Sequence, residues 1–248
     1  MHESEADDSP DEKYRLRHFW HTRNINDPPL LDRYTVNNVS IFVAYASYKL
    51  GFTPNQRSVA SGVFSGFAFV SALIMPPDSL ALSILAIFVL SQSSYLLDCA
   101  DGQLARATNT ESEFGDFLDS GIDITSAMFA FGSLFCYLFR YHYNSGSYFL
   151  GDVSLFVGFL FILARTSRYF LMKNFVNIFK QREIDLRKRR GFAEGLGGSF
   201  MDQQMSLFGM LLFLVSASSG FALYIAQSII LAAVAVRYFL RARQIAKS

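Results

Sequence analysis

The sequence predicts an all-α integral membrane protein, with six transmembrane helices and an N-terminal interfacial helix. Three observations support this prediction. Of the 248 residues, 51% are hydrophobic and 17% are charged, and the charged residues gather at the chain ends and in a few connections. Six apolar stretches each approach the ~20 residues that a helix needs to cross a bilayer. Turn-forming residues separate some of these stretches, as at Pro76-Pro77-Asp78 and at 144–147.

The expected elements follow one another along the chain. Residues 1–33 are polar and rich in both charge signs, so a cytosolic, partly disordered segment without a cleavable signal peptide is expected there. Residues 34–248 are expected to form the membrane domain. Within it, 36–50 is too short and too polar to span, which favours an interfacial helix lying on the membrane. The six spans are expected at 57–75, 78–99, 117–139, 149–172, 203–219 and 221–240, the fifth being marginal in length.

The distribution of Lys and Arg predicts the orientation. These residues are frequent in 173–202 and at the C-terminal end, whereas the connections near 76 and 219 contain none and 140–148 contains only Arg140. The positive-inside rule then places both termini, and the connection between the second and third spans, in the cytosol. The compact length and the absence of a targeting segment favour a prokaryotic plasma membrane.

Charge and cysteine usage exclude several classes of function. The formal net charge is +1, without a dominant basic face, which argues against a nucleic-acid-binding protein. Cys99 and Cys136 lie in apolar stretches without metal-ligand spacing, so neither a disulfide framework nor a zinc site is indicated.

Four aspartates stand where the second and third apolar stretches meet. Asp98 and Asp101, three apart, would share one face of a helix, and Asp119 and Asp123, four apart, would share a face of the next. Unneutralised charge at the edge of the hydrocarbon is costly and usually marks function. Ligand sets made only of oxygen suit hard divalent cations, so Mg²⁺ or Mn²⁺ is expected, and a pair of ions could bind a diphosphate.

This region resembles the signature of the CDP-alcohol phosphatidyltransferase family. That signature reads Asp, two residues, Asp-Gly, two residues, Ala-Arg, eight residues, Gly, three residues, Asp, three residues, Asp. Eight positions match it without a gap: Asp98, Asp101, Gly102, Ala105, Arg106, Gly115, Asp119 and Asp123. Upstream, Thr53-Pro54-Asn55 resembles a motif that often opens the first apolar segment in this family. Beyond about residue 130 the resemblance is one of general architecture.

The resemblance implies an enzyme that transfers a phosphatidyl-type group from a CDP-activated donor, such as CDP-diacylglycerol, to an alcohol acceptor. CMP is released, and the reaction belongs to phospholipid biosynthesis. The resemblance also implies a homodimer, and it implies that Asp123 acts as the general base in addition to binding metal.

Five further residues are candidates for binding the CDP donor: Asn55, Gly102, Ala105, Arg106 and Gly115. The two glycines and the alanine are small where the nucleotide must approach the backbone. Arg106 offers a fixed fork of donors to phosphate. Asn55 is suited either to binding phosphate or cytosine or to capping a helix.

Arg165 and Arg168 stand three apart within the otherwise apolar fourth stretch. A buried arginine in a membrane helix usually faces a partner or a polar cavity. One interpretation is a subsite for an anionic acceptor such as a phosphorylated polyol, and the other is charge pairing or snorkelling near the cytosolic end. The identity of the acceptor alcohol stays open.

Two other classes of protein share part of the pattern. A Mg²⁺-dependent membrane prenyltransferase also uses two aspartate-rich motifs, but Gly102, Ala105, Arg106 and Gly115 have no place in its pattern. A non-enzymatic cation transporter would distribute its carboxylates along a path, whereas here they cluster at one membrane face.

Overall fold

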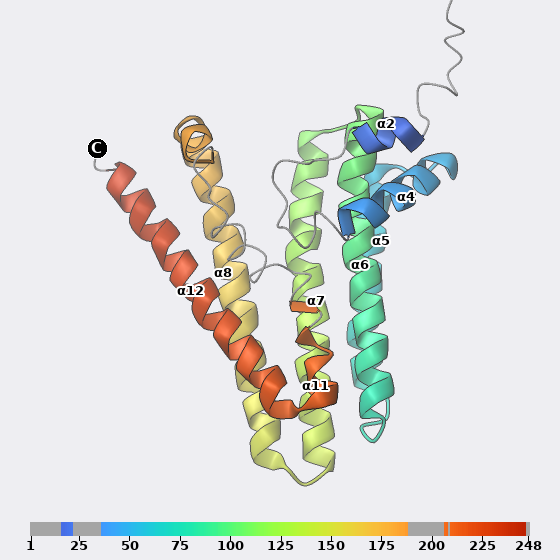
Figure 1. Ribbon diagram of the computed structural model, residues 1–248, viewed down its shortest axis with the longest axis vertical. Coiled ribbons are helices and arrows are strands. Elements are labelled where there is room, and N and C mark those ends of the chain that lie inside the picture. The colour runs from blue at the N-terminus through green and yellow to red at the C-terminus, as the bar shows by residue number, and fades with distance from the viewer. Residues whose placement is uncertain (1–15, 22–35, 188–205, 208, 247–248) are drawn as a thin grey trace, which may run out of the picture.

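The computed structural model describes residues 16–21, 36–187, 206–207 and 209–246, and all regular elements within these ranges are helices. This confirms the all-α class. The elements are α2 (Leu16–His21), α4 (Val36–Lys49), α5 (Pro54–Ile74), α6 (Leu80–Thr108), α7 (Glu113–Asn144), α8 (Tyr148–Arg187), α11 (Leu212–Val215) and α12 (Ala217–Ala246). The long helices α5 to α8 run up and down as neighbours, and α2 and α4 lie at the end of the bundle where α6 passes into α7 (Figure 1).

Within the described residues, five helices are long and apolar enough to cross a membrane. They are Pro54–Ile74, Leu80–Thr108, Glu113–Asn144, Tyr148–Leu171 and Ala217–Arg237. These helices correspond to the predicted spans one to four and six. The predicted fifth span, 203–219, lies partly outside the described residues, and α11 covers only four residues of it. Six crossings are therefore not confirmed, and neither is the position of α4 at a membrane surface, although the helix predicted at 36–50 is present.

Local capping fixes where α5 begins. The Thr53 backbone N–H donates to Gln56 Oε1 over 2.9 Å, and the Gln56 N–H donates to Thr53 Oγ1 over 3.3 Å. This reciprocal pair is a capping box, and Pro54 occupies the first helical turn, where its missing N–H costs nothing. The residues after Thr53 are thereby held at a defined position on the helix.

A short turn connects α6 to α7. Helix α6 continues nine residues beyond the predicted span end at 99, and it stops where Asn109 adopts the left-handed conformation with φ of 53°. Ser112 then caps α7, because its side chain accepts the Gly115 backbone N–H over 3.0 Å. The two helices that carry the halves of the aspartate motif are consequently joined by four residues and run side by side in opposite directions.

Small polar side chains bring α5 close to α6 and α7. Ser61 and Ser94 face each other with their hydroxyl oxygens 3.2 Å apart, and the Ser65 hydroxyl donates to Ser126 over 3.1 Å. All four serines are buried. In a membrane interior, small residues permit close helix approach and hydroxyls bond across the interface. Helix α5 is therefore anchored to both helices that carry the aspartates.

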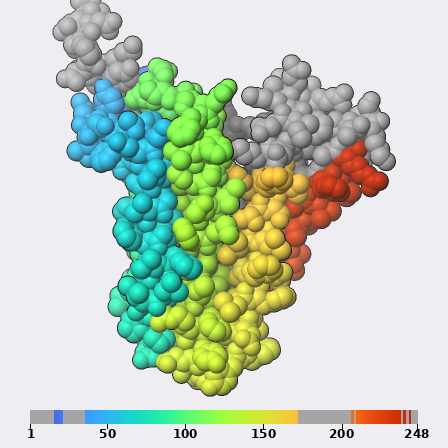
Figure 2. Space-filling model, turned by 180° about the vertical axis from the view of Figure 1, so that it is seen from behind, coloured from blue at the N-terminus to red at the C-terminus, as the bar shows by residue number. Residues whose placement is uncertain are grey.

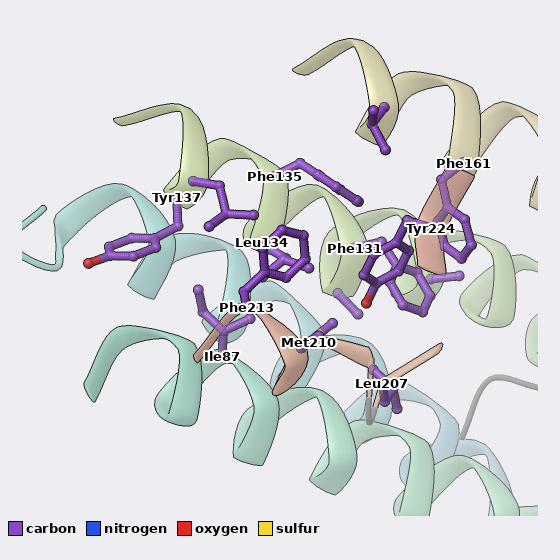
Figure 3. Close-up of a cluster of buried hydrophobic side chains, with 14 of the residues drawn as sticks. Ile87, Phe131, Leu134, Phe135, Tyr137, Phe161, Leu207, Met210, Phe213 and Tyr224 are labelled. Carbon is purple, nitrogen blue, oxygen red and sulfur yellow. The ribbon is translucent and has the colours of Figure 1, made fainter. Parts of the chain in front are cut away.

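An aromatic cluster joins the C-terminal part of the chain to α7 and α8 (Figure 3). The ring of Tyr224 on α12 lies edge-on to Phe135 of α7 and to Phe161 of α8, with centroids 5.1 Å and 4.9 Å away. The Tyr224 hydroxyl donates to the Ser206 carbonyl over 2.6 Å. Helices α7 and α8 lie side by side next to their connection and separate toward the other end (Figure 1, Figure 2).

Part of the polar N-terminal segment packs on the bundle. Phe19 of α2 is fully buried against α4 and α6, in a cluster that includes Ile41, Leu104 and Ala107. His18 Nε2 lies 2.9 Å from the Ala107 carbonyl oxygen, next to Arg106 in sequence. Within the segment 1–33, residues 16–21 are therefore helical, and the remainder lies outside the described residues.

Candidate active site

Three of the predicted carboxylates meet between α6 and α7. Asp98, Asp101 and Asp119 each offer an oxygen, and these oxygens lie within 4.8 Å of one another. The arrangement follows from the sequence: helical spacing puts Asp98 and Asp101 on one face of α6, and the short turn at 109–112 returns Asp119 to that face.

Asp123 lies at the edge of this group, one turn further along α7. Its carboxylate is a charged neighbour of Asp98. The hydroxyl of Tyr169, on α8, donates to Asp123 Oδ2 over 3.4 Å. The fourth predicted aspartate therefore neighbours Asp98 and contacts the helix that carries the two candidate acceptor arginines.

The carboxylate group fits a hard divalent cation. Asp101 is 3% exposed, and within the described residues the buried Asp98 Oδ1 has no hydrogen-bond partner. Carboxylates packed so closely repel one another unless a cation or protons neutralise them. The three oxygens lie within 4.8 Å of one another, and an all-oxygen donor set is the one that Mg²⁺ and Mn²⁺ prefer.

A hydroxyl from α5 also contacts the group. Ser58 is buried, and its Oγ donates to Asp101 Oδ2 over 2.5 Å. Ser58 and Tyr169 are absent from the site residues that the sequence predicts. A signal for Ser58 exists in retrospect, because Ser58, Ser61 and Ser65 recur at helical spacing and mark a polar face of α5.

The candidate donor residues lie beside the carboxylates in two pairs. On α6, the side chain of Arg106 folds over Gly102, so that a Cβ on this glycine would lie 3.4 Å from Arg106 Nη1. Across the turn, a Cβ on Gly115 would lie 3.5 Å from Asn55 Oδ1 at the start of α5. Ala105 is half-buried, and its carbonyl accepts the Thr110 N–H that closes α6.

Arg106 retains hydrogen-bonding capacity in this arrangement. Its Nε is buried and has no hydrogen-bond partner within the described residues, and Glu111 is the charged neighbour with the largest effect on it. A half-buried guanidinium of this kind can bind a phosphate oxygen without first breaking an internal contact at that nitrogen.

Arg165 and Arg168 are half-buried on α8. The Arg165 guanidinium lies over the ring of Phe131 on α7, with its central carbon 5.2 Å from the ring centroid. Arg165 and Tyr169 stand four apart and share a helix face, and Tyr169 contacts Asp123. The structure therefore brings Arg165 to the side of α8 that meets α7, the helix that carries Asp119 and Asp123.

Fold and site together define a helical membrane protein whose clustered carboxylates fit a divalent cation. The family model described as CDP-alcohol phosphatidyltransferase matches residues 52–239. The chain therefore belongs to the CDP-alcohol phosphatidyltransferase family, which confirms the family that the motif resembles and the predicted class of enzyme.

One curated relative is the archaetidylinositol phosphate synthase of Pyrococcus horikoshii, which is 42% identical to this chain over 84 residues. The similarity covers 34% of this chain and 41% of the relative, so the chain spans about two fifths of the relative's length.

Proposed function

We propose that the protein transfers a phosphatidyl-type group from a CDP-activated lipid, such as CDP-diacylglycerol, to an alcohol acceptor and releases CMP. One observation carries the proposal: Asp98, Asp101 and Asp119, contributed by both halves of the family signature, gather within 4.8 Å at the junction of α6 and α7. Membership of the CDP-alcohol phosphatidyltransferase family agrees with it.

The metal site in this proposal consists of Asp98, Asp101, Asp119 and Asp123 and holds Mg²⁺ or Mn²⁺, as a pair of ions. When bound, the ions neutralise the diphosphate of the donor and so lower the barrier to attack on phosphorus. The protein's contribution is to hold the carboxylates together in a buried setting where such charges act strongly.

The donor site in this proposal is formed by Asn55, Gly102, Ala105, Arg106 and Gly115. Arg106 donates to the diphosphate, and Asn55 hydrogen-bonds phosphate or cytosine. The small residues leave the backbone accessible to the nucleotide.

In this proposal Asp123 moves the proton. The acceptor hydroxyl oxygen forms a bond to the phosphorus that carries the lipid alcohol, and the bond from that phosphorus to the oxygen of CMP breaks. Asp123 takes the hydroxyl proton, and CMP leaves with the electron pair of the broken bond. Tyr169, which donates to Asp123 Oδ2, fixes the orientation of this carboxylate.

The acceptor in this proposal is anionic. Arg165 and Arg168 supply two guanidinium groups on α8, the helix whose Tyr169 contacts Asp123, and a guanidinium fork matches the geometry of a phosphate. The relative from Pyrococcus horikoshii is named archaetidylinositol phosphate synthase, a name that includes the words inositol phosphate. A phosphorylated polyol, such as an inositol phosphate, therefore matches both observations.

The membrane arrangement also forms part of the proposal. The chain crosses the membrane six times, with both termini and the active site in the cytosol of a prokaryotic plasma membrane, and works as a homodimer. The Lys and Arg distribution supports the orientation. The position of α4 at the same end of the bundle as the turn between α6 and α7 agrees with an interfacial helix beside the site (Figure 1).

Release of CMP by the purified protein tests the function. The protein is incubated with Mg²⁺ and either CDP-diacylglycerol or CDP-archaeol, and acceptors are compared in pairs: inositol phosphate against inositol, and glycerol phosphate against glycerol. CMP release with the phosphorylated member of one pair, and not with its uncharged counterpart, is expected. Absence of CMP release with every donor and acceptor would refute the proposed transfer.

A further inference from the structure

The hydroxyl of Ser58 forms a hydrogen bond with one carboxylate of the proposed metal site. Ser58 Oγ lies 2.5 Å from Asp101 Oδ2 and 3.4 Å from the Pro54 carbonyl oxygen. A serine has one hydroxyl proton to donate. The distances assign that proton to Asp101, and not to the carbonyl four residues back that a helical serine commonly uses.

Ser58 is held in place by its neighbours on α5. One turn before it, the capping box of Thr53 and Gln56 fixes the start of the helix. One turn after it, the Ser94 hydroxyl of α6 donates to the Ser61 carbonyl over 2.9 Å. The Ser58 side chain is buried, with 4% exposure. Its direction toward Asp101 is therefore set by the packing of α5 on α6.

We propose that Ser58 is a positioning residue for the metal site. Its hydrogen bond holds Oδ2 of Asp101, so that the carboxylate presents its remaining lone pairs to a divalent cation in one orientation. A carboxylate has about four lone-pair sites, so one hydrogen bond leaves it able to bind metal. Partners of this kind orient metal-binding carboxylates, and their loss typically weakens metal affinity or activity by about 10- to 100-fold.

This inference rests on the metal site of the proposed function, and direct metal binding tests it independently of turnover. Mn²⁺ is titrated into the purified full-length protein, and the free ion is followed by electron paramagnetic resonance. We expect Ser58→Ala to weaken Mn²⁺ binding about 10- to 100-fold. Ser58→Thr keeps the hydroxyl and should bind Mn²⁺ within about threefold of the natural protein.

Ser65→Ala is the matched control. Ser65 is also a fully buried serine of α5 at a helix interface, but its hydroxyl lies 2.8 Å from the Gly62 carbonyl oxygen and 3.1 Å from the Ser126 hydroxyl, and no carboxylate is among these partners. The Ser65 variant should lose as much thermal stability as the Ser58 variant and bind Mn²⁺ like the natural protein.

If Ser58→Ala fails to fold, Ser58→Cys replaces it. A thiol has a similar shape but is a weaker hydrogen-bond donor, so this variant should also weaken Mn²⁺ binding.

Several results would overturn the inference. The first is that the folded Ser58 variant binds Mn²⁺ as tightly as the natural protein does. The second is that Ser65→Ala loses as much Mn²⁺ affinity as the Ser58 variant, and the third is that the natural protein binds no Mn²⁺. CMP release, measured in parallel, separates the two proposals. If the natural protein binds Mn²⁺ and loses it in Ser58→Ala but releases no CMP, Ser58 positions a metal ligand and the proposed transfer is wrong.

Discussion

The hydroxyl of Tyr169 on α8 lies 3.4 Å from Asp123 Oδ2 on α7. Tyr169 therefore links the helix that carries Arg165 and Arg168 to the carboxylate that is the candidate general base. A base that must accept a proton from the acceptor needs a fixed orientation relative to the acceptor's binding groups. One hydroxyl placed between the two helices can provide that orientation.

Replacing Tyr169 with Phe should lower kcat about fivefold, corresponding to the loss of about 1 kcal/mol from one hydrogen bond. The KM for the CDP donor should not change, because the donor residues lie on α5, α6 and the start of α7. Steady-state CMP release measures both constants. Tyr143→Phe is the control, since Tyr143 is exposed near the other end of α7. An unchanged kcat in Tyr169→Phe would remove Tyr169 from the mechanism.

Changing Asp98, Asp101 or Asp119 to Asn should abolish CMP release and weaken divalent-cation binding. Each variant should stay folded in detergent, because removing one charge relieves repulsion among the carboxylates. Asp116→Asn is the control, as Asp116 is an exposed carboxylate in the first turn of α7 that lies outside the signature. Full activity in any of the three variants would contradict the metal-site assignment.

The clustering of the carboxylates could be predicted because it depends on residues that are close together in the sequence. Asp98 and Asp101 share a face through helical spacing alone, and a turn that reverses the chain suffices to add Asp119. The end of α6 could not be read from hydropathy, which marks the hydrocarbon region: the apolar stretch stops at 99, whereas the helix ends only at Asn109 with its left-handed backbone.

The contacts of Ser58 and Tyr169 depend on tertiary structure. Ser58 is 43 residues from Asp101 in the sequence, and Tyr169 is 46 residues from Asp123. No local period connects these pairs, since their meeting depends on how α5 and α8 pack on the two aspartate-bearing helices. The same reason explains the unpredicted packing of Phe19, a residue in a polar segment, against α4 and α6.

The close approach of α7 and α8 depends on Gly158. A Cβ at this position would lie 2.5 Å from Phe135 Cγ and 2.6 Å from Phe135 Cβ, atoms near the backbone that cannot move aside. Gly158→Ala should therefore destabilise the protein by about 1–3 kcal/mol, measured as a lower melting temperature in detergent. Gly66→Ala, where a Cβ meets nothing within 4 Å, should leave the melting temperature unchanged or raise it slightly. Equal melting temperatures for Gly158→Ala and Gly66→Ala would contradict the close packing of α7 on α8 at Gly158.

The proposed orientation can be tested by cysteine labelling of intact cells. After replacement of the natural Cys99 and Cys136 with Ala, single cysteines at Ser147 and Ser218 should react with an impermeant reagent added outside. Cysteines at Asn109 and Gln181 should react only after permeabilisation, because the Lys and Arg distribution places these positions in the cytosol. The reverse pattern would place the carboxylate site on the external face.

The two arginines of α8 carry the proposed preference for an anionic acceptor. If Arg165 and Arg168 bind the acceptor phosphate, replacing either with Leu removes a charge-assisted contact of about 1.5–3 kcal/mol. The KM for inositol phosphate, or for the phosphorylated acceptor that the protein uses, should then rise about 10- to 100-fold. Donor KM should stay constant. Arg165→Leu should also lower the melting temperature, because its guanidinium packs over Phe131 at 5.2 Å.

Arg140→Leu is the control that distinguishes a loss of acceptor binding from a loss of stability. Arg140 donates to the Ala72 carbonyl over 2.5 Å at the end of α5 remote from the carboxylates, so its loss should lower the melting temperature without changing acceptor KM. If Arg165→Leu and Arg168→Leu behave in the same way, with lower melting temperatures and unchanged acceptor KM, both arginines are structural. The relative's name would then be the remaining support for a phosphorylated acceptor, and the comparison of phosphorylated with uncharged acceptors would have to establish it.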